Sequence, residues 1–139
     1  MLCQIDAQRE RMANTQYMHQ RRALHPSEFH ATGGGNCVDH SLATADFLSC
    51  FGISVVIGGF FAEGDVAGHA LVLVPVQRVP AGYTPVVLSG DIHMNGRVFS
   101  AGTYIPIDYQ YVGGFSNATA PNARLTNLWY PQDMIGGFF

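Results

Sequence analysis

A chain of 139 residues, 47% hydrophobic and 12% charged, predicts one domain that can bury a core and excludes a highly charged disordered chain. The formal net charge of −3, without a Lys/Arg cluster, argues against a nucleic-acid partner. No apolar run approaches the roughly 18 residues of a membrane span and no signal-peptide pattern begins the chain. We therefore expect a cytoplasmic protein without a membrane partner, while a secreted effector or a viral origin stays open. Two of the three cysteines, Cys3 and Cys50, are interpreted as small buried hydrophobes in a reducing compartment.

The first predicted elements are a helical segment and a glycine-rich loop. Residues 4–24 are dominated by Gln, Arg, Met and Ala, which favours one weakly amphipathic helix or two short ones. Pro26 ends this segment, because proline cannot continue a helix. Residues 26–35 are then expected to form a loop that ends in three consecutive glycines.

A second helix is predicted from Asn36 to Phe51. Four further apolar residues recur at helical spacing within it: Val38, Leu42, Ala45 and Leu48. Asn36 is placed to cap the first turn, and Asp39 lies where the positive end of the helix dipole favours a negative charge. Gly52 fits the C-terminal cap.

The next part of the chain is rich in β-branched and aromatic residues and predicts strands. Residues 53–61 form the first strand, and residues 69–76 form a second one that is almost continuously apolar and therefore central in the sheet. Residues 86–109 are expected to form a hairpin around Asn95-Gly96, followed by a strand over 103–109.

From Val112 onward the chain is rich in Gly, Asn, Ala and Pro, and we expect mostly loop, anchored by Leu128-Trp129-Tyr130. These elements predict an α+β fold, in which N-terminal helices and a helix beginning at a cysteine pack on a mostly antiparallel sheet. The expected organisation is one domain with three parts: an N-terminal helical segment (1–30), a catalytic core (33–110) and a loop-rich C-terminal segment (111–139).

Cys37 is the strongest candidate for a reactive residue. It follows Gly33-Gly34-Gly35-Asn36 and begins the second helix, where the positive end of the helix dipole favours a thiolate. His69 begins one predicted strand and Asp108 lies near the end of another. Cysteine, histidine and aspartate occur in the chain order expected of an acyl-transferring thiol enzyme, with His69 as the base and Asp108 orienting its imidazole.

Acyl transfer also needs hydrogen-bond donors for the oxyanion that develops on the attacked carbonyl. The backbone N–H of Cys37 is one candidate. The second donor is left open among three side chains: Asn36, His30 and Gln110. Gly35 and Gly68 are candidates for substrate contacts, because a residue without a Cβ leaves space for an approaching backbone.

A metal site is the main chemical alternative. Cys37 and His40 are three residues apart on one predicted helix face, and His69 with His93 or Asp91 could complete a set of four ligands. No second closely spaced pair of Cys or His supports this site. We therefore rank it below the thiol enzyme and expect no metal and no cofactor.

Three short motifs of this chain resemble the transglutaminase-like superfamily within the broader papain-like group of Cys-His-Asp enzymes. They are Gly35–Leu42 continuing to Gly52-Ile53, then Gly68-His69-Ala70, and then Tyr104–Asp108. The stretches Gly34–Leu42 and Ile107–Gly114 are also similar to arylamine N-acetyltransferases. The resemblance implies a transglutaminase-like core over about residues 33–110, with Cys37 as nucleophile, His69 as base and Asp108 as its partner.

The sequence thus predicts thiol-dependent acyl transfer on an amide bond of a peptide or protein, through a thioester intermediate and without a cofactor. We rank a cysteine peptidase, deamidase or amidase above a crosslinking transglutaminase. Two alternatives stay open. One is a non-catalytic binding or structural module, such as a virion or assembly component. The other is a metal-binding protein that uses Cys37, His40 and His69. The oligomeric state is not predicted.

Overall fold

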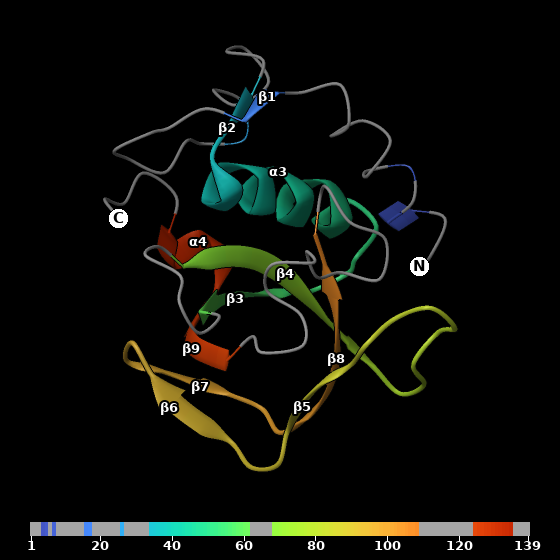
Figure 1. The fold of residues 1–139 in the computed structure, drawn as a ribbon, viewed down its shortest axis with the longest axis vertical. Helices are drawn as coiled ribbons and strands as arrows, with labels where there is room; N and C mark the ends of the chain where they lie inside the picture. The colour runs from blue at the N-terminus through green and yellow to red at the C-terminus, as the bar shows by residue number, and fades with distance from the viewer. Residues whose placement is uncertain are drawn as a thin grey trace.

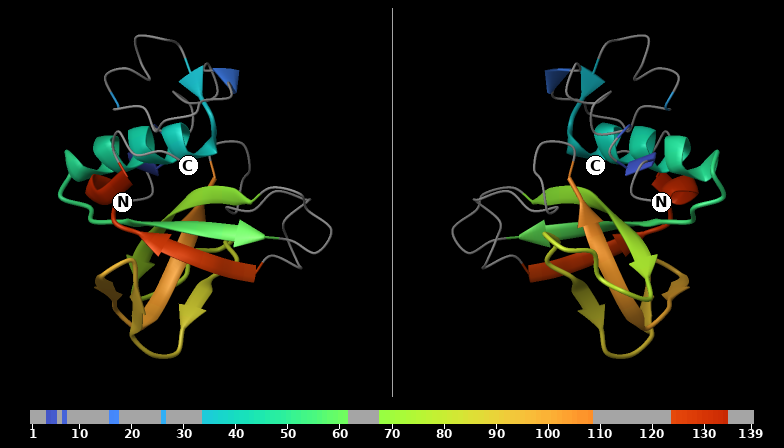
Figure 2. Two further views of the ribbon diagram at one scale, coloured as in Figure 1. Left: turned by 90° about the vertical axis from the view of Figure 1, so that its left-hand side faces the viewer. Right: turned by 90° about the vertical axis from the view of Figure 1, so that its right-hand side faces the viewer.

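The computed structural model describes residues 34–61, 68–108 and 124–134, together with positions 4, 5, 7, 16, 17 and 26. A five-stranded antiparallel sheet lies between a helix on one face and a β-hairpin below the other (Figures 1 and 2). The described elements are β1 (Gln16–Tyr17), β2 (Gly34–Gly35), α3 (Cys37–Ser49), β3 (Val56–Phe61), β4 (His69–Val76), β5 (Val86–Leu88), β6 (Ile92–Met94), β7 (Arg97–Phe99), β8 (Gly102–Ile107), β9 (Arg124–Trp129) and α4 (Pro131–Met134).

The strand order in the large sheet is β5-β8-β4-β3-β9, and every neighbouring pair is antiparallel. The predicted strand over 69–76 is therefore confirmed, and so is its central position. The strand predicted over 53–61 begins later, at Val56. A mixed fold of helix and antiparallel sheet agrees with the α+β prediction.

Both ends of α3 are stabilised by local hydrogen bonds that its sequence predicts. Asn36 Oδ1 accepts a hydrogen bond from the Asp39 backbone N–H at 3.0 Å, and the Asn36 backbone N–H donates to Asp39 Oδ2 at 2.9 Å. This reciprocal capping box contributes on the order of 1 kcal/mol. At the other end Gly52 has a φ of 73°, and the Ile53 N–H donates to the Leu48 carbonyl at 3.2 Å. The predicted caps are both confirmed.

The core fills both faces of the sheet, which explains why β4 is almost continuously apolar. Successive residues of a strand point to opposite faces, so Val72 and Val74 pack toward α3 while Leu71 and Leu73 pack toward the hairpin. The cluster on the α3 side consists of Ile5, Ala45, Leu48, Val55, Val72, Val74, Ile105 and Ile107. The opposite cluster consists of Val56, Phe60, Leu71, Leu73, Leu88, Phe99, Tyr104 and Leu128.

The hairpin forms around the predicted turn but pairs differently from the prediction. Asn95 and Gly96 both have positive φ, 54° and 72°, as a two-residue hairpin turn of this type requires. The turn joins β6 to β7 in a separate two-stranded sheet. Val86–Leu88, expected to lead into this hairpin, instead pairs with β8 at the edge of the large sheet.

Strand β9 lies in the segment that was predicted to be mostly loop, so that prediction is wrong for Arg124–Trp129. The strand forms the second edge of the sheet, against β3. A Cβ added at Gly59 would lie 3.0 Å from Trp129 Cζ3, so the bare glycine backbone makes room for the indole ring. Arg97 and Asp133 form a bidentate ion pair, with both N···O distances 3.0 Å, which joins β7 to α4.

The prediction of helix over residues 4–24 is wrong at Gln16–Tyr17. These two residues form β1 and pair in parallel with Gly34–Gly35. Gln4, Ile5 and Ala7 are helical, and the rest of this range lies outside the described residues, as does Cys3. Cys50 was predicted to be buried but is exposed, because the helix ends in a solvent-facing turn there. Within the described residues no helix is both long and apolar enough to cross a bilayer.

Candidate active site

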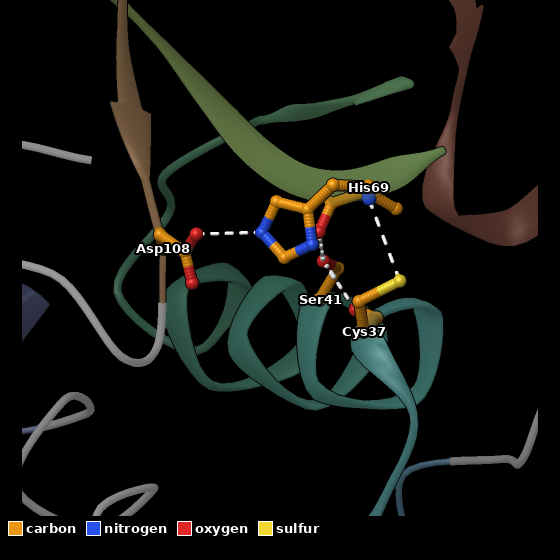
Figure 3. Close-up of polar contacts among 5 residues, drawn as sticks. Cys37, Ser41, His69 and Asp108 are labelled. Carbon is orange, nitrogen blue, oxygen red and sulfur yellow. Dashed lines mark hydrogen bonds and ion pairs between the residues drawn. The ribbon is translucent and has the colours of Figure 1, made fainter. Parts of the chain in front are cut away.

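Cys37 is the first residue of α3, directly after the capping residue Asn36. Its side chain is half-buried and lies between the start of the helix and the start of β4 (Figure 3). The backbone N–H of Ala70 donates a hydrogen bond to Cys37 Sγ at 3.4 Å. The sulfur therefore lies against a backbone N–H of β4 and at the N-terminal end of α3.

His69 and Asp108 meet because their strands are neighbours in the sheet. His69 begins β4 and Asp108 directly follows β8, and the register that places Val72 opposite Ile107 brings both residues to the same end of the two strands. His69 Nε2 lies 2.6 Å from Asp108 Oδ2, and the Asp108 side chain is fully buried. A short bond to a buried carboxylate fixes both the orientation of the imidazole and the proton on Nε2.

The charge of His69 follows from its two neighbours. Burial by itself lowers the pKa of His69, but the hydrogen bond to Asp108, a hydrogen bond with Cys37 and the charges of both partners raise it to about 10. Because Nε2 faces Asp108, the other ring nitrogen, Nδ1, is the one available to Cys37 (Figure 3). At neutral pH the site thus holds an imidazolium between a carboxylate and the sulfur.

The structure therefore brings the three predicted residues Cys37, His69 and Asp108 into one chain of contacts. Cys37 lies at a helix start, His69 at a strand start and Asp108 directly after a strand end. Helix and strand termini place these groups on rigid elements, and an arrangement of thiol, imidazole and carboxyl group is one that thiol acyl transfer can use.

His40 does not join Cys37 and His69 in a metal site. It is buried, its Nδ1 donates to the Asn36 carbonyl at 2.9 Å, and burial lowers its pKa although that hydrogen bond and the charges of Asp39 and Asp108 oppose the shift. Among the residues that the structure describes, no group of three His, Cys, Asp or Glu side chains could hold a metal ion.

The candidate oxyanion and substrate residues have local structural roles. Asn36 Oδ1 accepts the capping hydrogen bond, and Gly35 pairs with Tyr17 in the sheet of β1 and β2. A Cβ added at Gly68 would lie 2.8 Å from Phe61 Cε2 and 3.2 Å from the Phe60 carbonyl oxygen. A neighbouring side chain and backbone thus explain the glycine at position 68. His30 and Gln110 lie outside the described residues.

Ser41 is a residue of the site that the sequence analysis missed. Its hydroxyl lies 2.7 Å from the Cys37 carbonyl oxygen and 3.3 Å from the Ala70 carbonyl oxygen (Figure 3). The one signal in the sequence was a serine four residues after Cys37 on the predicted helix.

The fold is similar to solved structures of LapG from Legionella pneumophila. The EGTA-treated structure has a TM-score of 0.60 and 14% identity, over 99% of this chain and 71% of that chain. The calcium-bound structure has the same TM-score and identity, over 94% of this chain and 69% of that chain. No protein-family model and no curated protein matches the sequence. At this identity the likeness shows a shared fold.

Proposed function

We propose that this protein is a cysteine hydrolase that cleaves an amide bond in a peptide or protein substrate. The observation that carries the proposal is the placement of His69 between the buried Asp108 and the sulfur of Cys37. The fold likeness to LapG, a cysteine protease, supports the same class of activity. Transfer of the acyl group to an amine, as in a crosslinking enzyme, remains ranked below transfer to water.

The first half of the proposed reaction forms a thioester. The Cys37 thiolate attacks the carbonyl carbon of the scissile amide, and the carbonyl oxygen takes the negative charge in a tetrahedral intermediate. The backbone N–H of Cys37, at the start of α3, is the proposed donor to that oxygen. The intermediate collapses as the C–N bond breaks, and His69 Nδ1 gives its proton to the leaving amine.

The second half releases the acid. Neutral His69 takes a proton from water through Nδ1, and the resulting hydroxide attacks the thioester carbon. The C–S bond breaks, the carboxylic acid leaves, and the thiolate–imidazolium pair is restored. Asp108 accepts the hydrogen bond from Nε2–H throughout, so that Nδ1 always faces the reacting atoms.

Selective alkylation of Cys37 tests this proposal. Iodoacetamide at pH 6 should label Cys37 at least about tenfold faster than Cys50, because an ordinary thiol is largely protonated at that pH. Cys50 is exposed whereas Cys37 is half-buried, so accessibility alone would give the opposite order. The rate at each site is measured by mass spectrometry of peptides after short reaction times.

The control for this experiment is His69→Gln, which keeps a polar side chain of similar size but carries no charge. In this variant the rate at Cys37 should fall to that at Cys50 or below. A wild-type protein whose Cys37 reacts no faster than Cys50 at pH 6 would contradict the proposed function.

A further inference from the structure

The hydroxyl of Ser41 connects the two elements that carry the nucleophile and the base. Ser41 lies in the second turn of α3 and is 4% exposed. Its Oγ donates to the Cys37 carbonyl at 2.7 Å, and the Ala70 carbonyl of β4 lies 3.3 Å from the same oxygen. One hydroxyl proton is thus shared between a carbonyl of the helix and a carbonyl of the neighbouring strand (Figure 3).

Ala70 contacts the start of α3 through both of its backbone polar groups. Its carbonyl accepts from Ser41, and its N–H donates to Cys37 Sγ at 3.4 Å. Ala70 directly follows His69 in the chain, so the position of its backbone constrains the position of the His69 side chain. The separation between the sulfur and the imidazole therefore depends on how closely Ala70 is held against the helix.

We propose that Ser41 is a positioning residue that holds the start of β4 against the start of α3, so that Cys37 stays within reach of His69. This inference rests on the proposed function, because it assigns Ser41 a role in that site. A hydroxyl that served the helix alone would be satisfied by the Cys37 carbonyl four residues earlier. The second contact, to a strand 29 residues away in sequence, is the one that joins the two elements.

The titratable groups near His69 determine what the pH profile of Cys37 alkylation reports. Asp108 faces the ring from the end of β8, and Cys37 faces it from α3. His40, also on α3, is buried, and burial lowers its pKa. The pH profile of Cys37 alkylation therefore reports mainly the contact between Cys37 and His69, which a loss of general stability would not change.

The test compares three variants by the rate of iodoacetamide labelling of Cys37 between pH 5 and 10. Ser41→Ala should lower the rate at pH 7 by about tenfold and move the midpoint of the profile to higher pH, because a small displacement of reacting groups has large kinetic effects. Ser41→Thr keeps the hydroxyl and should keep the wild-type profile. Ser49→Ala is the matched control: Ser49 bonds the Asp46 carbonyl of the same helix at 2.6 Å, and among the residues that the structure describes its hydroxyl makes no hydrogen bond to a strand.

A double-mutant cycle separates positioning from other effects. If Ser41 acts through His69, adding Ser41→Ala to His69→Gln should change the labelling rate of Cys37 by less than about twofold. An equal loss in both backgrounds would overturn the proposal, as would a wild-type profile in folded Ser41→Ala. If circular dichroism shows that Ser41→Ala does not fold, Ser41→Thr serves as the test instead. A pH profile of Cys37 labelling in Ser41→Thr that matches the profile of His69→Gln would then overturn the proposal.

These results distinguish the two proposals. A reactive wild-type Cys37 with an unchanged Ser41→Ala profile contradicts only the positioning role. A wild-type Cys37 that labels no faster than Cys50 contradicts the proposed function and the positioning role together.

Discussion

Cys37→Ala is expected to lower the rate of amide hydrolysis by on the order of 10³-fold or more while the protein stays folded. The large loss follows because no other described group near His69 can form the thioester. The fold should persist because Cys37 is half-buried at a helix start and its capping contacts belong to Asn36 and Asp39. Turnover of a fluorogenic peptide-amide library and thermal unfolding by circular dichroism are measured for both proteins.

Cys50→Ala is the matched control for this variant. Cys50 lies at the other end of α3, is exposed, and makes its sulfur contact with Asp46 of its own helix. It should retain wild-type turnover. Activity that survives in folded Cys37→Ala would remove Cys37 from the mechanism, whereas a large drop in melting temperature would show that the thiol serves the core instead.

Asp108→Asn is expected to lower turnover by on the order of 10²-fold or more with a smaller effect on stability. An asparagine side chain fits the same space, but its NH₂ group can donate where His69 Nε2–H needs an acceptor, which leaves the wrong ring nitrogen protonated. The loss of the carboxylate also removes the hydrogen bond and charge that raise the pKa of His69. A variant that turns over at the wild-type rate would make Asp108 a structural acid only.

The stability effect of Asp108→Ala has a definite pH dependence. The pKa of His69 rises from 6.5 to about 10 in the fold, so its interaction with Asp108 and Cys37 stabilises the folded protein fully below pH 6.5. This stabilisation is lost as the pH rises from 6.5 to 10. The difference in free energy of unfolding between wild type and Asp108→Ala, measured with urea, should be larger at pH 6 than at pH 10. Equal differences at the two pH values would contradict the charged state assigned to His69.

The parts of the fold that were predicted correctly are those with strong local signals. The capping box of Asn36 and Asp39 and the glycine at position 52 define α3 within a few residues of sequence. Strand β4 is buried on both faces, so its apolar run is long and uninterrupted. Burial on both sides gives a signal that needs no knowledge of the neighbouring strands.

The parts that were missed depend on pairing between distant segments. Strand β9 pairs with β3 through a register shift between Gly59 and Phe60, and its alternation of exposed and half-buried residues ends where Leu128 is buried. Strand β1 is two residues long and exists only through its pairing with Gly34–Gly35. Such short or irregular edges carry little signal in their own residues, because the partner strand defines them.

In the candidate site, too, the features with local sequence signals were predicted and those that depend on distant segments were not. The order of Cys37, His69 and Asp108 and their places at element ends predicted that they would meet, and the structure places them in contact. Ser41 could not be predicted, because the carbonyl it shares belongs to Ala70 on another element. The catalytic roles of these residues remain predictions that the variants above address.

The most direct test of the central claim is to trap the acyl group on Cys37. The protein is mixed with a peptide p-nitrophenyl ester, quenched in acid within one turnover, digested and analysed by mass spectrometry. We predict an acyl group on Cys37 that hydroxylamine removes, as expected of a thioester. It should be absent from Cys50 and strongly reduced in His69→Gln. Release of p-nitrophenol without an acyl group on Cys37, or equal acylation of Cys37 and Cys50, would contradict the proposed thiol mechanism.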